Sequence, residues 1–202
     1  MSLAALAGFV DAIGFLLTGG FFVSFMSGNS TRLAVAAAQG SRLAILAGGL
    51  VGSFLLGVIA GAFVAGWNQD RRKTAVMAWS TGALAIAAGL VTLRLPIAAA
   101  LVFAGGMGIL NNVFQREGEV SVGVTYMTGT LVRAGQRIAG ALGKQGPSDW
   151  LPYLMLWASL VAGAIAGAFA ASVNLRLSSW IAALLCALMA IFARHLEATR
   201  AA

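Results

Sequence analysis

The sequence predicts an all-α polytopic membrane protein, on the basis of its composition, its long uncharged stretches and the hydropathy pattern within them. The 202 residues are 60% hydrophobic and only 9% charged, and the mean hydropathy is +0.91. That composition leaves too little polar surface to cover a water-soluble globule. Lipid is therefore the expected solvent and the lipid bilayer the expected partner.

The uncharged stretches are each long enough to cross a bilayer core of about 30 Å as a helix. Runs such as 46–66 do not alternate apolar and polar residues, which excludes barrel strands and leaves helices. The connections between the stretches are too short for a soluble domain, so we expect a single membrane domain over 1–202. The uncharged stretches are 12–31, 43–69, 74–93, 95–115, 150–175 and 177–193.

An internal repeat divides the chain at about residue 94. An offset of 101 residues places FMSGNSTR (25–32) over YMTGTLVR (126–133) and Asp11 over Asn112. A second block, IAGAFVAG (59–66), matches IAGAFAAS (165–172) at an offset of 106. We therefore predict a first repeat over 1–94 and a second over 95–202.

Each predicted half holds a first segment, a motif segment and two plain apolar helices. If all eight segments cross the membrane, the loop Lys and Arg divide five against five. If the first and motif segments form one broken crossing, the division is six against three. The positive-inside rule thus favours about six crossings, with both termini cytoplasmic, and makes the halves inverted repeats with broken motif helices. The segments are 3–17, 21–38, 43–66 and 74–93, then 97–114, 120–142, 151–172 and 178–193.

The interruptions of these helices are the predicted functional positions. Gly19 and Gly20 break the first half, and Gly118 and Gly123, with Glu117 and Glu119, break the second. The two glutamates suit either a cavity lining or a solvated turn. Small polar residues follow each break, and the free N–H groups of a helix N-terminus suit an anionic group. The alternative is that Gly28 and Gly129 only allow close helix packing. The candidate solute-binding residues are Ser27, Gly28, Asn29, Arg32, Asn112, Thr128, Gly129, Thr130 and Arg133.

Asp11 is a carboxylate among the apolar residues of the first segment, where a charge is expensive unless it is paired or hydrated. It is therefore the candidate for proton coupling, because an apolar environment favours its neutral form while Arg32 or Arg133 would hold it ionised. The other interpretation is a structural ion pair or an interfacial residue. The first twenty residues also lack a basic leader, so we expect them to be part of the fold.

Several functional classes are disfavoured. His195 and Cys186 are the only His and Cys, so we expect no metal site, no nucleophile and base pair, no catalytic residues and no cofactor, and hence no enzyme. The net charge of +7 comes from single basic residues scattered between apolar stretches, which argues against nucleic acid as a partner.

The chain resembles the YoaK-like family of small bacterial inner-membrane proteins, a domain of unknown function. The resemblance rests on AGFVDAIGFL (7–16), FVSFMSGNSTRLA (22–34), GMGILNN (106–112) and VTYMTGTLVR (124–133). It covers nearly the whole chain. It implies about six crossings in a bacterial inner membrane, and it implies no substrate.

The function expected from these features is secondary transport of a small solute by alternating access, with an anion or zwitterion weakly favoured. The alternatives are an ion or small-solute channel, in which the broken helices form a filter, and a non-transporting membrane scaffold. A homodimer is a further expectation, with helix contacts through the small-residue runs 57–61 and 163–167.

Overall fold

The computed structural model describes residues 1–116, 119–120, 126–143 and 149–201. Nearly all of these residues are helical, and four helices are long and apolar enough to cross a membrane. The prediction of an all-α membrane protein is confirmed. The elements are α1 (Ser2–Thr18), α2 (Met26–Ala38), α3 (Leu43–Trp67), η1 (Gln69–Arg71), α4 (Arg72–Thr92), α5 (Pro96–Leu110), η2 (Asn111–Phe114), β1 (Gln115–Arg116), β2 (Glu119–Val120), α6 (Met127–Leu142) and α7 (Leu151–Ala201).

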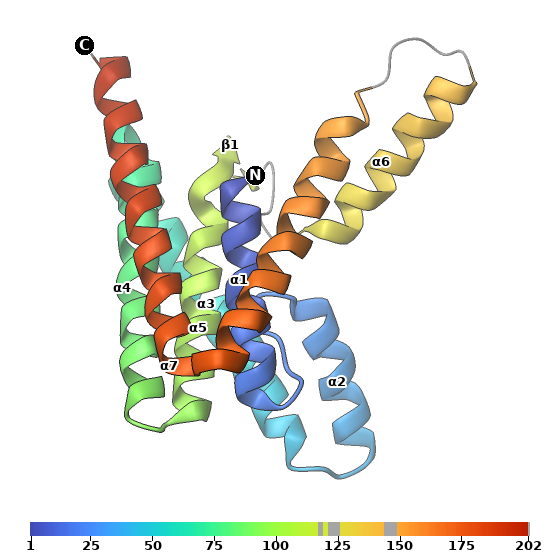
Figure 1. Ribbon diagram of the computed structural model, residues 1–202, viewed down its shortest axis with the longest axis vertical. Helices are drawn as coiled ribbons and strands as arrows, with labels where there is room; N and C mark the ends of the chain where they lie inside the picture. The colour runs from blue at the N-terminus through green and yellow to red at the C-terminus, as the bar shows by residue number, and fades with distance from the viewer. Residues whose placement is uncertain (117–118, 121–125, 144–148, 202) are drawn as a thin grey trace.

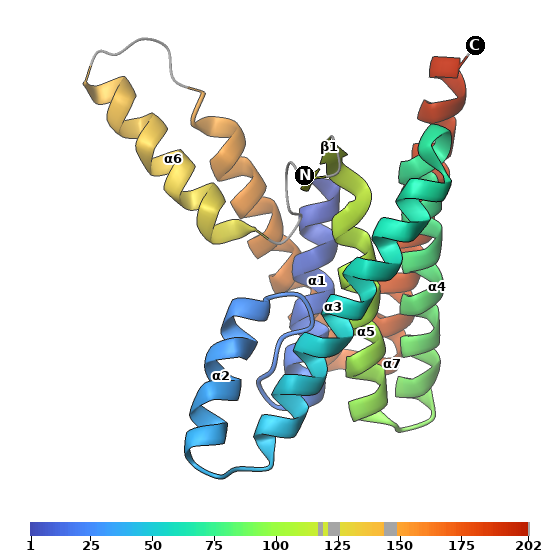
Figure 2. The ribbon, with the colours of Figure 1, turned by 180° about the vertical axis from the view of Figure 1, so that it is seen from behind.

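The long helices run roughly along one axis of the molecule and change direction from one to the next (Figure 1). These are α1, α3, α4, α5 and the two arms of α7, and both chain termini lie at the same end. The shorter helices α2 and α6 instead begin near mid-height and run toward opposite ends, α2 away from the termini and α6 toward the end where they lie (Figures 1 and 2).

The helix α7 is bent at Asn174, which has the non-helical angles φ −156° and ψ 100°. The Oδ1 atom of Asn174 accepts a hydrogen bond of 3.0 Å from the Leu177 N–H, as an N-cap does for a new helix. The predicted separation of the last two apolar helices, between 172 and 178, is confirmed, and the second arm of α7 begins just after Asn174.

The predicted break at Gly19 and Gly20 is also confirmed. Both have positive φ, 69° and 124°, which glycine adopts without a Cβ penalty. The chain reverses at these residues and returns as a non-helical segment, 20–25, which reaches the start of α2 at mid-height (Figure 1). The corresponding break predicted at Gly118 and Gly123 lies outside the described residues, as does Glu117.

Close glycine contacts join α1 to the first arm of α7 and α3 to α5. A Cβ atom at Gly8 would overlap the Leu160 carbonyl oxygen, and one at Gly108 would overlap the Phe54 carbonyl oxygen. The two glycines are 100 residues apart in the sequence, and the two carbonyls are 106 apart. Two interfaces are therefore built alike. One is formed by α1 and the first arm of α7, and the other by α5 and α3.

The small-residue runs belong to the same two interfaces. A Cβ atom at Gly57 would overlap the carbonyl of Gly105, and one at Gly163 would overlap that of Ala5. The glycines of both runs therefore pack against neighbouring helices of the same chain, and the homodimer stays a prediction.

A long-range cap ties the C-terminal end of α7 to the start of α4. The Glu197 carboxylate accepts hydrogen bonds from the backbone N–H groups of Lys73 (3.0 Å) and Thr74 (3.4 Å) and from the Thr74 hydroxyl (2.6 Å). These N–H groups belong to the first turn of α4, where no acceptor exists within the helix.

We expect Glu197→Ala to lower the free energy of unfolding by about 1–2 kcal/mol, the usual cost of removing a helix cap. Glu197→Gln keeps an acceptor oxygen and should retain most of that stability. Thermal unfolding of both variants in detergent tests the cap. Equal losses in the two variants would assign the effect to the charge of Glu197 instead.

Candidate functional site

A cavity of about 730 Å³ lies where the first turns of α2 and α6 meet α3 and the end of α5. We call it the Arg133 cavity, because Arg133 is the one charged side chain among the described residues of its lining. Those described residues include no carboxylate. The lining comprises Ser24, Phe25, Met26 and Ser27 from the start of α2, Phe54 and Val58 from α3, Asn111, and Tyr126, Met127, Thr128, Gly129, Val132, Arg133 and Gln136 at the start of α6.

The first turns of α2 and α6 are built in the same way. The N-cap residues are Phe25 and Tyr126, and neither caps its helix with a side-chain hydrogen bond. The ring three residues before the motif glycine packs on that glycine in both helices. A Cβ atom at Gly28 would lie 2.6 Å from the Phe25 ring, and one at Gly129 would lie 3.0 Å from the Tyr126 ring. The glycines therefore let these rings fold over the helix starts.

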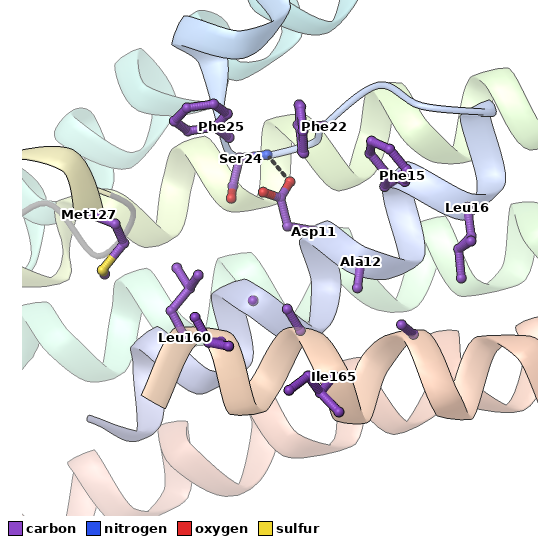
Figure 3. A pocket seen from close by; sticks show the side chains of 14 residues that line it. Asp11, Ala12, Phe15, Leu16, Phe22, Ser24, Phe25, Met127, Leu160 and Ile165 are labelled. Carbon is purple, nitrogen blue, oxygen red and sulfur yellow. Dashed lines mark hydrogen bonds between the residues drawn. The ribbon is translucent and has the colours of Figure 1, made fainter. Parts of the chain in front are cut away.

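A second cavity, of about 790 Å³, lies between α1, the first arm of α7 and the non-helical segment 20–25. We call it the Asp11 cavity. Its walls are almost entirely apolar, and the Asp11 carboxylate, part of the lining, is turned toward the segment that carries Ser24 (Figure 3). Ser24, Phe25 and Met127 line both cavities, so these three residues separate them.

The Asp11 carboxylate is bound by backbone. Its Oδ1 atom accepts hydrogen bonds from the N–H groups of Val23 (2.8 Å) and Ser24 (2.9 Å). Among the described residues it makes no ion pair with Arg32 or Arg133. Asp11 thus provides the partner that two N–H groups of the interrupted helix need in an apolar environment.

Asn29 is fully buried, and its side-chain amide pairs with the backbone of one residue. Its Oδ1 accepts the Phe22 N–H (3.0 Å) and its Nδ2 donates to the Phe22 carbonyl (2.6 Å). Both ends of the amide are therefore used to hold the non-helical segment against α2. The amide does not face either cavity.

Arg32 lies on aromatic rings rather than at the Arg133 cavity. Its guanidinium carbon is 5.2 Å from the centroid of the Phe21 ring and about 6 Å from those of Phe15 and Phe22. Such cation–π contacts place the charge beside the reversal at Gly20. The two motif arginines, expected to act together, therefore lie in different surroundings.

The remaining candidates divide between the cavity and the core. Ser27, Thr128 and Gly129 line the Arg133 cavity, whereas Gly28 does not. Thr130 is buried, and its hydroxyl donates to the Tyr126 carbonyl (3.0 Å). Asn112 is also buried, and its Nδ2 donates across to the Val58 carbonyl on α3 (3.1 Å).

The packing corrects the expected register between Asp11 and Asn112. The contacts of Gly8 and Gly108 relate α1 to α5 by 100 residues, not by the 101 that relates the motifs. Asp11 therefore corresponds to Asn111, which lines the Arg133 cavity as Asp11 lines the other. Sequence identity in a glycine- and alanine-rich helix could not reveal this difference of one residue between the register of the helix contacts and that of the motifs.

Sequence reasoning missed several lining residues. Gln136 follows Gly129 by seven residues and Arg133 by three, so a helical face through the motif contains all three. Phe25 and Tyr126 are aligned in the predicted repeat, so that alignment could have identified them as lining residues. Phe54 and Val58 carry no such signal, since they are ordinary apolar residues of α3. Within the described residues, no three His, Cys, Asp or Glu side chains come together as a metal site would require.

Comparisons with known proteins identify relatives of this chain. The family described as "Protein of unknown function (DUF1275)" matches residues 1–192. A protein of Rhizobium meliloti (strain 1021), "UPF0700 transmembrane protein RA0705", is 39% identical over 188 residues, covering 91% of this chain and 79% of the relative. No solved structure matches the chain.

Proposed function

The chain belongs to the DUF1275 family of membrane proteins, and on that premise we propose that it is a secondary transporter of a small solute. The observation that carries the proposal is the Arg133 cavity, on which the starts of α2 and α6 converge from the two halves of the chain. Interrupted helices whose ends meet at one site are a recurring feature of transporters.

We propose six crossings, formed by α1, α3, α4, α5 and the two arms of α7, with α2 and α6 as re-entrant helices. The opposed directions of α2 and α6 support an inverted repeat (Figure 1), and so do the matching glycine contacts of the two interfaces. The start of α4 carries Arg71, Arg72 and Lys73 at the end where both termini lie. The positive-inside rule makes that end cytoplasmic, in the inner membrane of a bacterium.

The solute is proposed to be an anion or a zwitterion. Arg133 is the single charged group among the described lining residues of its cavity, and the N-terminal turns of two helices add partial positive charge there. Asn111 and Gln136 supply amide groups to the same wall. Asp11, on the other side of Ser24, Phe25 and Met127, is the proposed coupling carboxylate. Rocking of the two halves about Ser24, Phe25 and Met127 would expose the solute site to one side of the membrane and then to the other.

Accessibility of the cavity can be measured before the solute is known. Ser27→Cys and Thr128→Cys are each placed in a Cys186→Ala background, since Cys186 is the chain's single cysteine. A membrane-impermeant maleimide is applied to right-side-out and to inverted membrane vesicles. We expect both cysteines to react from either side, whereas Leu55→Cys, at an exposed apolar position of α3, should not react.

Flux then separates a transporter from a channel. Proteoliposomes are tested with radiolabelled acetate, succinate and glycine betaine. Saturable uptake with counterflow is expected, and Arg133→Gln should reduce it at least tenfold while Arg137→Gln, one turn further along α6 and outside the cavity lining, does not. Unsaturable flux would identify a channel. Cysteines that react from one side only or from neither, together with no flux, would refute the proposal and favour a scaffold.

A further inference from the structure

A third cavity, of about 550 Å³, lies at the end of the molecule opposite the chain termini. It is bounded by the connection between α4 and α5, by the bend of α7 and by the end of α1. We call it the arginine-pair cavity, because Arg94 and Arg176 both line it. The rest of its lining is Leu17, Val91, Pro96, Val173, Asn174 and Leu175.

No negatively charged side chain among the described residues lines this positively charged cavity. Neither Arg94 nor Arg176 forms an ion pair within the described part of the chain, and no carboxylate lines the cavity. The described acidic residues other than Asp11 belong to segments at the opposite end, namely Asp70 in η1, Glu119 in β2, Asp149 before α7 and Glu197 near the end of α7. The two guanidinium groups are therefore open to an external anion.

Arg94 has a left-handed backbone conformation that usually favours glycine. Its φ is +60°, and the hydrogen bonds from its N–H to Val91 O (3.1 Å) and from Leu95 N–H to Leu90 O (2.9 Å) form a Schellman motif. Glycine is the residue that ordinarily ends a helix in this way. An arginine is disfavoured in that conformation, and its presence there points to a role for its side chain.

The cavity lies at the depth expected of lipid headgroups. Trp180, on the second arm of α7, is half-exposed, and its Nε1 donates to the Thr92 hydroxyl at the end of α4 (3.4 Å). Tryptophan collects at the interface between membrane and water. The first turns of α5 and of the second arm of α7 begin beside the cavity, at Pro96 and Leu175.

We propose that the phosphate of an anionic phospholipid binds between Arg94 and Arg176, with its glycerol and upper acyl chain against the apolar wall. Guanidinium groups bind phosphate oxygens by paired, charge-assisted hydrogen bonds. Free phosphate offers the same oxygens, but it has no apolar part to pack against the apolar residues that make up most of the lining, such as Leu17 and Val173. A lipid matches both parts of the cavity.

The test is native mass spectrometry of the full chain with phosphatidylglycerol and with phosphatidylcholine of the same acyl chains. We expect phosphatidylglycerol to be retained preferentially, and Arg94→Gly and Arg176→Gln each to weaken its binding about fivefold, the effect of one arginine near an anionic headgroup. Arg94→Gly is informative because glycine suits a φ of +60°. Its thermal stability without lipid should equal or exceed that of the wild type.

Arg42→Gln is the matched control, since Arg42 precedes α3 at the same end of the molecule but does not line the cavity. It should retain wild-type lipid binding. Equal weakening by Arg42→Gln, or no preference between the two lipids, would overturn the site. A thermal stabilisation by inorganic phosphate alone, lost in Arg94→Gly, would show that the cavity binds free phosphate and would overturn the assignment to lipid.

Discussion

Asp11→Leu is expected to lower the thermal midpoint of the protein strongly, because it leaves two backbone donors without their acceptor. The change removes the acceptor of the Val23 and Ser24 N–H groups, which hydrogen-bond to it at 2.8 and 2.9 Å. Each orphaned donor costs about 1–3 kcal/mol, and the almost entirely apolar walls of the cavity offer little to replace the carboxylate. Thermal unfolding in detergent and the yield of folded monomer measure the effect.

Asp11→Asn is the control that separates the structural role of Asp11 from proton coupling. Its amide oxygen still accepts from Val23 and Ser24, so the variant should fold and lose only about 1 kcal/mol, the charged part of the hydrogen bonds. It cannot release a proton. If Asp11→Asn unfolds as readily as Asp11→Leu, the backbone contacts do not explain the importance of this residue. If it folds but transports without a proton gradient, coupling is assigned to Asp11.

Gly163→Ala is expected to disrupt the interface between α1 and the first arm of α7. The new methyl group would overlap the carbonyl oxygen of Ala5, and backbone atoms cannot move aside as a flexible side chain can. Overpacking of this kind costs about 1–3 kcal/mol or more. Gly57→Ala meets the carbonyl of Gly105 and should have a similar cost. The thermal midpoint in detergent measures both.

Gly82→Ala serves as the matched control, because Gly82 is also helical and a Cβ atom there meets nothing within 4 Å. The substitution should leave stability unchanged or raise it by up to about 1 kcal/mol, the difference in helix propensity. A loss in Gly82→Ala as large as that in Gly163→Ala would mean that helix packing does not account for the glycines of this chain.

Much of the helix layout could be predicted because it depends on local properties. The length of the uncharged stretches alone predicts membrane helices. Gly19 and Gly20 signal a break because glycine, which has no Cβ atom, readily adopts the positive φ angles found there. The division of α7 was likewise visible, since Asn174 and Arg176 interrupt an apolar run. These features require no knowledge of which helices touch.

The candidate site was predicted less completely, because a motif does not show which way its side chains face. Asn29 and Arg32 belong to the same motif as Ser27, yet their positions on the helix turn Asn29 toward the backbone of Phe22 and Arg32 toward the ring of Phe21. Thr128, Gly129 and Arg133 instead line a cavity. Rotation of a helix about its axis is set by its neighbours, and a single sequence does not contain that information.

Residue order is enough to predict that lipid is the solvent, that helices cross it and where those helices are interrupted, since each follows from the local cost of placing charge or unpaired backbone in hydrocarbon. The partners of the polar groups at the interruptions depend instead on helix packing. Asp11 pairs with backbone twelve and thirteen residues away, and Glu197 caps a helix more than a hundred residues away. Such partners depend on which helices pack together and in what register, and many contacts spread along the whole chain set that packing.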